Sequence, residues 1–139
     1  MKPSGYSGTP LAKKLGIKPG FKCRLIDQPE YYFGLFTDMP DDVSFISDKK
    51  VKKNFIHFFT RSAKELEKQI ASLRSEIEPD GMIWVSWPKK AAKIETDITE
   101  NEVRELALTN GLVDVKVCAV DEIWSGLKLV IRVKDRPKV

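Results

Sequence analysis

The stretch that decides the fold is GMIWVSWPKK, residues 81–90. Its first part is apolar at nearly every position, which is typical of a strand that is covered on both faces of a sheet. Pro88 ends the run, because proline has no amide hydrogen to donate to a neighbouring strand. The pattern therefore predicts a buried strand that places Trp87, Lys89 and Lys90 at one edge of a sheet.

Helical patterns lie on both sides of this strand. A capping box formed by Ser62 and Glu65 begins a helix predicted over residues 62–78, whose apolar positions recur every three or four residues. A second capping box, formed by Thr99 and Glu102, begins another helix. Both helices are amphipathic, so each is expected to pack one face against the sheet.

Short extended segments supply the strands of the predicted sheet. Six strands are predicted over residues 21–26, 43–46, 54–59, 82–87, 113–120 and 127–133, and two short helices over residues 9–16 and 30–36. Only six residues join the last two strands, which is too few for a parallel crossover, so we expect that pair to be antiparallel. The element order predicts an α/β fold: a three-layer, Rossmann-like arrangement with a mostly parallel sheet and an antiparallel last strand.

Length and composition are those of a soluble globular protein. The chain has 139 residues, with 42% hydrophobic and 32% charged residues, which predicts a single domain over residues 1–139. Residues 1–8 and 135–139 are expected to be loose ends. There is no apolar run long enough for a membrane span and no secretory signal. The two isolated cysteines suit a reducing environment, so we expect a cytoplasmic location.

The basic residues do not indicate a nucleic-acid-binding protein. The net charge is only +4, and nucleic-acid readers are typically more basic along one stripe. The densest cluster, residues 49–53, has four lysines and is interpreted as a solvated turn rather than a phosphate-tracking patch. Nucleic acid is therefore not the expected partner.

Polar and aromatic residues gather at the carboxyl ends of the predicted strands. Ligands of open parallel sheets bind beyond these ends, so we expect a site there. Asp27 directly follows the strand predicted over residues 21–26, and Thr60 directly follows the one over residues 54–59. The candidate ligand-binding residues are Arg61, Ser62, Trp87, Lys89, Lys90, Asp121, Glu122 and Trp124.

The start of the helix at residue 62 is the best anion site that the sequence offers. Helix starts carry a partial positive charge and free amides, and Arg61 and Lys89 would add charge nearby. The alternative is that Ser62 only caps the helix and that Arg61 is solvated. The expected partner is a small anionic ligand or a protein, and the sequence does not identify a cofactor.

The remaining candidates each allow two interpretations. Trp87 and Trp124 either form an aromatic wall for a planar ligand or pack in the core, and packing is favoured for Trp87. Asp121 and Glu122 either act as acid and base or pair with the neighbouring lysines across the rim.

Several common sites are missing from the sequence. His57, the only histidine, lies inside NFIHFF, which favours a partnered buried histidine over a catalyst. One histidine and two distant cysteines give no metal-ligand spacing, so no metal site is expected. The loop DQPEYYFG, residues 27–34, also lacks the glycines with which a dinucleotide fingerprint follows a first strand.

Residues 4–20 and 80–132 resemble a bacterial family catalogued as domain of unknown function three-zero-five-two. The specific marks are SGTPL, WPKK, GLVDVKVCAVDE and WSGLK. This resemblance implies a stand-alone bacterial cytoplasmic protein and no assigned activity. The element order also resembles a truncated class I methyltransferase, which implies a methyltransferase-like sheet without the glycine motif that holds the methyl donor.

The expected function is therefore that of a bacterial α/β module that binds a small ligand or a protein. One alternative is a divergent S-adenosylmethionine-dependent methyltransferase, and another is a weak nucleic-acid-binding protein. The sequence leaves open whether the protein is an enzyme and how many copies associate.

Overall fold

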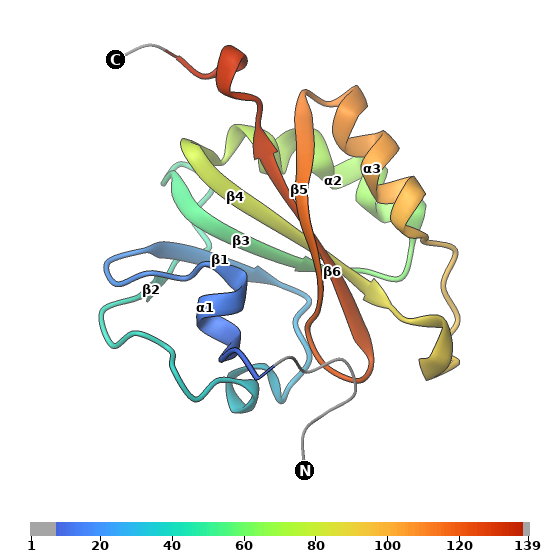
Figure 1. The fold of residues 1–139 in the computed structure, drawn as a ribbon. Helices are drawn as coiled ribbons and strands as arrows, with labels where there is room; N and C mark the ends of the chain where they lie inside the picture. Colours follow the sequence, from blue (N-terminus) through green and yellow to red (C-terminus); the bar gives the residue numbers. More distant parts are fainter. Residues whose placement is uncertain (1–7, 138–139) are drawn as a thin grey trace.

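A computed structural model describes residues 8–137 of the protein, and all of its strands join one sheet (Figure 1). The strands are β1 (Lys22–Ile26), β2 (Ser44–Phe45), β3 (Lys53–Phe59), β4 (Ile77–Pro88), β5 (Leu112–Ala119) and β6 (Trp124–Ile131). The α-helices are α1 (Leu11–Leu15), α2 (Ala63–Ser75) and α3 (Glu100–Thr109). Short 3₁₀ helices are η1 (Tyr32–Leu35), η2 (Lys90–Ala92) and η3 (Val133–Asp135).

The sheet has the order β2-β1-β3-β4-β6-β5. The pairs β1–β2, β1–β3 and β3–β4 are parallel, whereas β6 is antiparallel to both β4 and β5. The fold class predicted from the sequence is confirmed, including the reversed last strand. That strand does not lie at the edge of the sheet, because β6 is inserted between β4 and β5.

Two apolar clusters cover the two faces of the sheet. On one face, α2 and α3 pack on the odd-numbered side chains of β4, including Ile83, Val85 and Trp87. The other face is the one on which α1 lies (Figure 1). There α1 packs on Met82 and Trp84. Because consecutive strand residues point to opposite faces, the continuous apolar run of β4 supplies both clusters at once.

The second helix ends earlier than its apolar pattern predicts. α2 stops at Ser75, and Ile77, which was expected to continue the helix, is already part of β4 and aligns with Lys53 of β3. The Lys53 amide donates a hydrogen bond to the Glu76 carbonyl over 2.9 Å, which starts the pairing of β3 with β4. Pairing with β3 thus ends the helix at Ser75, three residues before its predicted end at residue 78.

The helix starts confirm half of each predicted capping box. The Ser62 hydroxyl accepts from the Glu65 amide, and the Thr99 hydroxyl accepts from the Glu102 amide, both over 3.2 Å. The Ser62 amide, however, donates to the Thr60 hydroxyl rather than to a glutamate.

The ends of the chain differ from their predictions in two places. The first helix, predicted from residue 9, begins at Leu11 with Pro10 at its N-cap, and the carboxylate of Asp38 accepts from the amides of Ala12 and Lys13. Val133, expected on the apolar side of the last strand, is 76% exposed, because β6 ends at Ile131. Most of the expected loose ends lie outside the described residues, although Asp135 belongs to η3.

Candidate functional site

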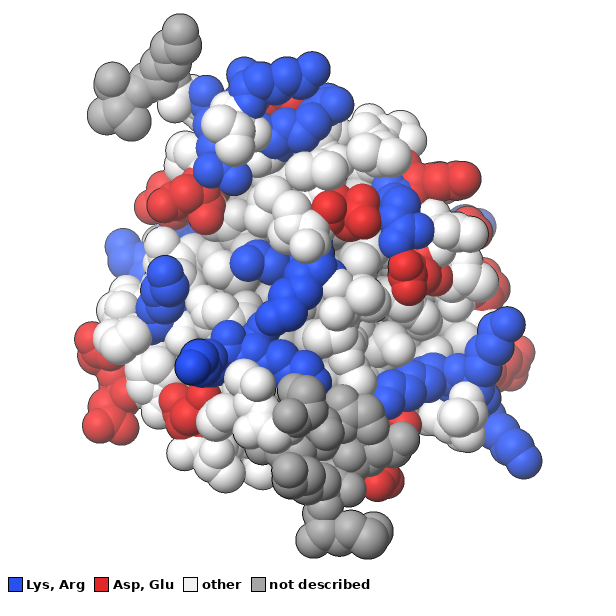
Figure 2. Space-filling view, in the orientation of Figure 1, with Lys and Arg blue, Asp and Glu red and all other residues white. Residues whose placement is uncertain are grey.

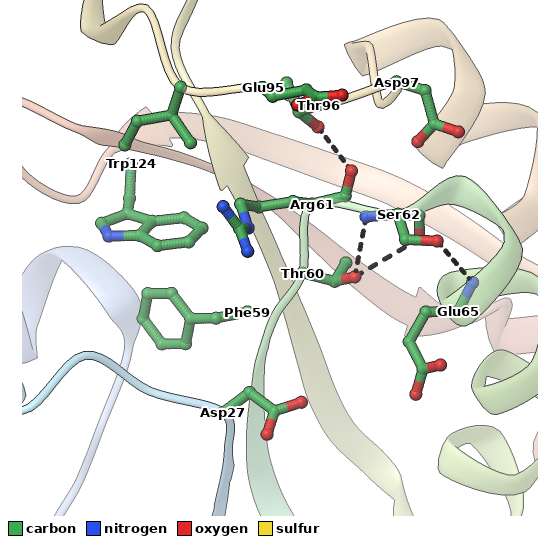
Figure 3. Close-up of a pocket in the computed structure, with 11 residues that line it drawn as sticks. Asp27, Phe59, Thr60, Arg61, Ser62, Glu65, Glu95, Thr96, Asp97 and Trp124 are labelled. Carbon is green, nitrogen blue, oxygen red and sulfur yellow. Dashed lines mark hydrogen bonds between the residues drawn. The ribbon is translucent and has the colours of Figure 1, made fainter.

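A cavity of about 880 Å³ opens at the carboxyl edge of the sheet (Figure 3). Its walls come from the ends of β1 and β3, the start of α2, the loop between η2 and α3, and the first residue of β6. The lining residues are Asp27, Phe59, Thr60, Arg61, Ser62, Glu65, Ile94, Glu95, Thr96, Asp97 and Trp124.

The topology explains why these segments meet. β1 and β3 are parallel neighbours, so Asp27 and Thr60 follow their strands at the same edge of the sheet. β6 runs in the opposite direction, so its first residue, Trp124, lies at the edge where the parallel strands end. The cavity is therefore located where ligands of open α/β sheets bind.

Two aromatic side chains form the apolar wall of the cavity. Trp124 meets Phe59 edge to face, with ring centroids 5.1 Å apart and an interplanar angle of 89° (Figure 3). Phe59 is buried and stacks on His57 from behind, with centroids 4.1 Å apart. The stacked contact with His57 and the edge-to-face contact with Trp124 hold the Phe59 ring in place, so the apolar wall is rigid on that side.

The opposite wall is a loop that is tied to the start of α2. The Arg61 carbonyl accepts hydrogen bonds from the Thr96 hydroxyl over 2.8 Å and from the Asp97 amide over 3.3 Å. The Ala63 amide donates to the Asp97 carboxylate over 2.8 Å. These three bonds hold the loop against the helix and give the cavity a defined shape.

The same bonds change what the start of α2 can bind. The Ala63 and Glu65 amides, which would face an anion at a helix start, already donate to Asp97 and Ser62. The carboxylate of Asp97 thus occupies the place that the sequence suggested for an anionic ligand. A negative charge at this end is favourable for the helix dipole, which explains why it is held there.

The cavity as a whole carries negative charge. Four carboxylates line it, and Arg61 is the only basic residue among its lining residues. Within residues 8–137, Arg61 forms no ion pair and its side chain is exposed. The four acids are Asp27, Glu65, Glu95 and Asp97. Such a charge balance favours a ligand with a positive group over an anion.

Three of the residues predicted from the sequence line this cavity: Arg61, Ser62 and Trp124. Trp87 does not line it. Its side chain is only 7% exposed and packs in the apolar cluster under α2 and α3, as the packing interpretation of this residue predicted. Of these two tryptophans, only Trp124 therefore forms part of the aromatic wall of the cavity.

The remaining four predicted residues lie at the same edge but outside the cavity. The Lys89 amide donates to the Ile123 carbonyl over 2.8 Å, and Lys90 begins η2 with an exposed side chain. Asp121 accepts from the Ile123 and Trp124 amides, which holds the turn between β5 and β6. Glu122 is exposed on that turn.

Sequence reasoning missed the loop that closes the cavity. Ile94, Glu95, Thr96 and Asp97 lie in the connection from β4 to α3 and were not considered as site residues. The sequence could have indicated this loop. It follows the carboxyl end of a central parallel strand, and ligands bind at that edge of the sheet.

Asp27 has an unusual backbone conformation at the mouth of the cavity. Its φ is 56°, in the left-handed region that glycine adopts easily and other residues at a cost. Aspartate tolerates this region better than most residues. The chain therefore turns sharply at the end of β1 with a carboxylate at the turn.

His57 is buried behind this wall and has two hydroxyl partners. Its Nδ1 lies 3.0 Å from the Tyr32 hydroxyl and its Nε2 lies 2.8 Å from the Ser86 hydroxyl, so one nitrogen donates and the other accepts. Burial lowers the pKa of His57 to about 3. The prediction of a partnered, buried histidine is confirmed.

Two further properties of residues 8–137 bear on function. They contain no group of three or more His, Cys, Asp or Glu side chains arranged to hold a metal ion. No helix in this part of the chain is long and apolar enough to cross a membrane.

The fold resembles that of class I methyltransferases. The structure resembles magnesium protoporphyrin IX methyltransferase from Synechocystis PCC 6803 (TM-score 0.57, 14% identity, covering 87% of this chain and 74% of that one). It also resembles ribosomal protein L11 methylase from Lactobacillus delbrueckii subsp. bulgaricus (TM-score 0.56, 14% identity, 86% and 73% covered). At such identities the likeness concerns the fold alone.

The chain belongs to the DUF3052 family, a family of proteins of unknown function whose sequence model matches residues 43–133. No curated protein sequence matches the chain significantly. The family resemblance noted from the sequence is thereby confirmed, and it brings no activity with it.

Proposed function

We propose that the protein is a binding module for a small ligand that carries a positive charge and a planar or apolar part. The observation that supports this most directly is the cavity itself, which combines the Phe59–Trp124 wall with four carboxylates. Its volume of about 880 Å³ is within the range of roughly 300–1,000 Å³ that is usual for small-molecule sites.

The charges of the lining residues favour a cationic ligand over the anionic ligand expected from the sequence. An anion in the cavity would face the four carboxylates, and the Ala63 and Glu65 amides at the start of α2 already donate to other groups. A cation gains attraction from the carboxylates, and the face of Trp124 adds roughly 0.5–2 kcal/mol if the charge lies over the ring. Arg61 is then available for a polar or acidic group on the same ligand.

A second candidate function is that of a divergent S-adenosylmethionine-dependent methyltransferase. The fold favours it, and S-adenosylmethionine has both a sulfonium cation and a planar adenine. The segment after β1 disfavours it, because Gly34 is the only glycine in residues 27–35 and the chain turns at Asp27 without a glycine loop. S-adenosylmethionine is therefore one compound to test rather than the assigned ligand.

The proposed location is the cytoplasm. Both cysteines are free thiols, with Cys23 buried and Cys118 half-buried, as suits a reducing compartment.

Thermal-shift and calorimetric titrations of the full chain test the proposal. The compounds are S-adenosylmethionine, S-adenosylhomocysteine, and arylalkyl amines, whose amino groups are protonated at neutral pH, as simple cations. We expect saturable binding of at least one cationic compound, weakened roughly tenfold in Glu95→Gln and in Trp124→Ala, since a lost charged contact is worth about 1.5–3 kcal/mol.

Glu122→Gln is the matched control for Glu95→Gln, because it removes the same charge from the same edge of the sheet outside the cavity. It should bind the compound as the wild type does. Absence of binding for every cationic compound would overturn the proposal, and so would binding that Glu95→Gln and Trp124→Ala leave unchanged.

A further inference from the structure

A second charged surface lies away from the cavity, beside α1. A band of basic side chains crosses the face of the molecule on which α1 lies, in front of β5 and β6 (Figures 1 and 2). Four lysines from three segments of the chain lie near one another on this side of the sheet: Lys14, Lys18, Lys116 and Lys128. None of the four lines the cavity described above.

The sheet register holds two of these lysines directly opposite each other. Lys116 of β5 pairs with Lys128 of β6, so both side chains point to the same face of the sheet. Lys128 in turn pairs with Trp84 of β4, which belongs to the cluster under α1. The two ammonium groups are therefore presented on the side of the sheet where α1 lies.

Contacts with α1 bring the other lysines to the same place. The Lys116 ammonium donates to the Lys14 carbonyl over 2.9 Å, and the Lys14 ammonium donates to the Ala119 carbonyl over 2.9 Å. A side chain at Gly16, just past α1, would come within 3.9 Å of the Lys128 ammonium. The end of α1 and the β5–β6 hairpin thus bring Lys14, Lys116 and Lys128 together. Lys18, three residues beyond α1, is close enough for its charge to act on Lys128.

No carboxylate neutralises this cluster within residues 8–137. None of the four lysines takes part in an ion pair there. The pKa of Lys128 is lowered by partial burial and by the positive charges of Lys116 and Lys18. Like charges placed directly opposite each other destabilise a strand pair, so the isolated protein bears a cost that a bound anion would remove.

We propose that Lys14, Lys18, Lys116 and Lys128 form a binding site for the phosphoryl groups of a small ligand. The arrangement suits one or two adjacent phosphoryl groups, because contacts around the end of α1 join Lys14, Lys116 and Lys128, and the charge of Lys18 reaches Lys128. A stripe for a nucleic-acid backbone would instead follow the surface in one direction. This site is independent of the cavity and of the ligand proposed for it.

Calorimetric titration of the full chain with inorganic pyrophosphate at low salt tests this proposal. We expect saturable binding by the wild type and at least tenfold weaker binding by Lys128→Gln. Lys49→Gln, which removes the same charge from an exposed turn, is the matched control and should bind as the wild type does. Glu95→Gln, in the cavity, should also leave pyrophosphate binding unchanged, which separates this site from the proposed cation site.

Melting temperatures separate binding from a structural role of Lys128. If the lysine serves an anion, Lys128→Gln without pyrophosphate should melt at or above the wild-type temperature, because charge repulsion is relieved, and pyrophosphate should no longer raise it. A lower melting temperature of the free variant, together with unchanged binding, would mean a structural role and overturn the proposal.

Two further ligands identify the source of the phosphoryl groups. Binding of a nucleoside triphosphate at least tenfold tighter than pyrophosphate would support a nucleotide, and similar affinities would support recognition of the phosphoryl groups alone. The proposal fails if pyrophosphate does not bind, if Lys128→Gln and Lys49→Gln weaken it equally, or if only a single-stranded oligonucleotide binds.

Discussion

His57 holds a neutral imidazole between two hydroxyl groups in the interior of the protein, and this has a consequence for stability. Its pKa in the fold is about 3, against an unfolded value of 6.5, so the unfolded chain takes up a proton that the folded chain does not. The stability that depends on the neutral ring is complete above pH 6.5 and is lost as the pH falls from there toward 3.

Acid titration of stability is therefore predicted to depend on His57. The free energy of unfolding should fall by about 1 kcal/mol between pH 6 and pH 5 relative to the His57→Gln variant, which cannot take up this proton. Urea denaturation at the two pH values measures it. Carboxylates titrate in both proteins, so a parallel pH dependence of the two would contradict the burial of a neutral ring.

Asp27 permits a test that separates its backbone from its charge. We predict that Asp27→Ala is less stable than Asp27→Gly by about 1 kcal/mol. The reason is the φ of 56°, a left-handed conformation that is unfavourable for alanine and accessible to glycine. Both variants lose the same carboxylate, so both should bind a cationic ligand equally weakly. Equal stability in urea denaturation would show that the turn carries no strain.

At the scale of elements, a buried charge network joins the middle of β1, the start of β3 and the residue before β4. Glu76 accepts from the Arg24 guanidinium over 2.7 and 2.8 Å and from the Lys53 ammonium over 3.0 Å, while the Lys53 ammonium also donates to the Asp48 carbonyl. Lys53 and Glu76 are fully buried or nearly so. Two cations face one carboxylate, so the network depends on Glu76.

Removing that carboxylate is predicted to be costly. Glu76→Gln should lower the free energy of unfolding by about 3 kcal/mol, because it leaves Lys53 charged and buried without a counterion. Glu67→Gln, an exposed change on α2, is the control and should have an effect within about 0.5 kcal/mol. A small loss for Glu76→Gln in chemical denaturation would mean that Lys53 is solvated or neutral.

The elements also show which contacts a sequence can predict. The hydroxyl caps of Ser62 and Thr99 act over three residues, so spacing was enough to find them. Asp97 reaches Ala63 across 34 residues and Asp38 reaches Ala12 across 26, and no local pattern contains such pairs. The placement of Asp97, one of the four carboxylates of the cavity, depends on one of these distant contacts and was missed.

Burial on both faces limits prediction in β4 in another way. In a strand that is apolar throughout, no alternation shows which side chains point to α2 and α3 and which to α1. Trp87 was therefore predicted at the ligand edge only because it lies near the end of the strand. Its side chain points to the same face as those of Ile83 and Val85, which is the face that α2 and α3 cover.

At the scale of the whole molecule, the sequence predicted the fold class and the direction of every strand but not their order. The short loop before β6 requires that β6 pairs antiparallel with β5, which it does. The loop says nothing about a second neighbour of β6. Pairing of β6 with β4 as well depends on side chains from distant parts of the chain, such as Val85 opposite Leu127.

This shared sheet predicts a single unfolding transition. Both apolar clusters use β4, so neither can lose its packing without the other. Tryptophan fluorescence, which reports on Trp84, Trp87 and Trp124 of β4 and β6, should change with urea together with far-ultraviolet circular dichroism. Two separate midpoints would show that the α1 side and the α2–α3 side unfold independently.

The insertion of β6 between β4 and β5 also has a consequence for synthesis on the ribosome. β4 lies between β3 and β6 in the sheet, and β6 is the last strand to be translated. β4 is therefore synthesised well before β6. Until residue 131 has left the exit tunnel, the growing chain displays the free side of a long apolar strand, which is a hazard for aggregation. Nascent chains arrested before that point should therefore bind chaperones that recognise extended apolar segments, and chains arrested well after it should release them.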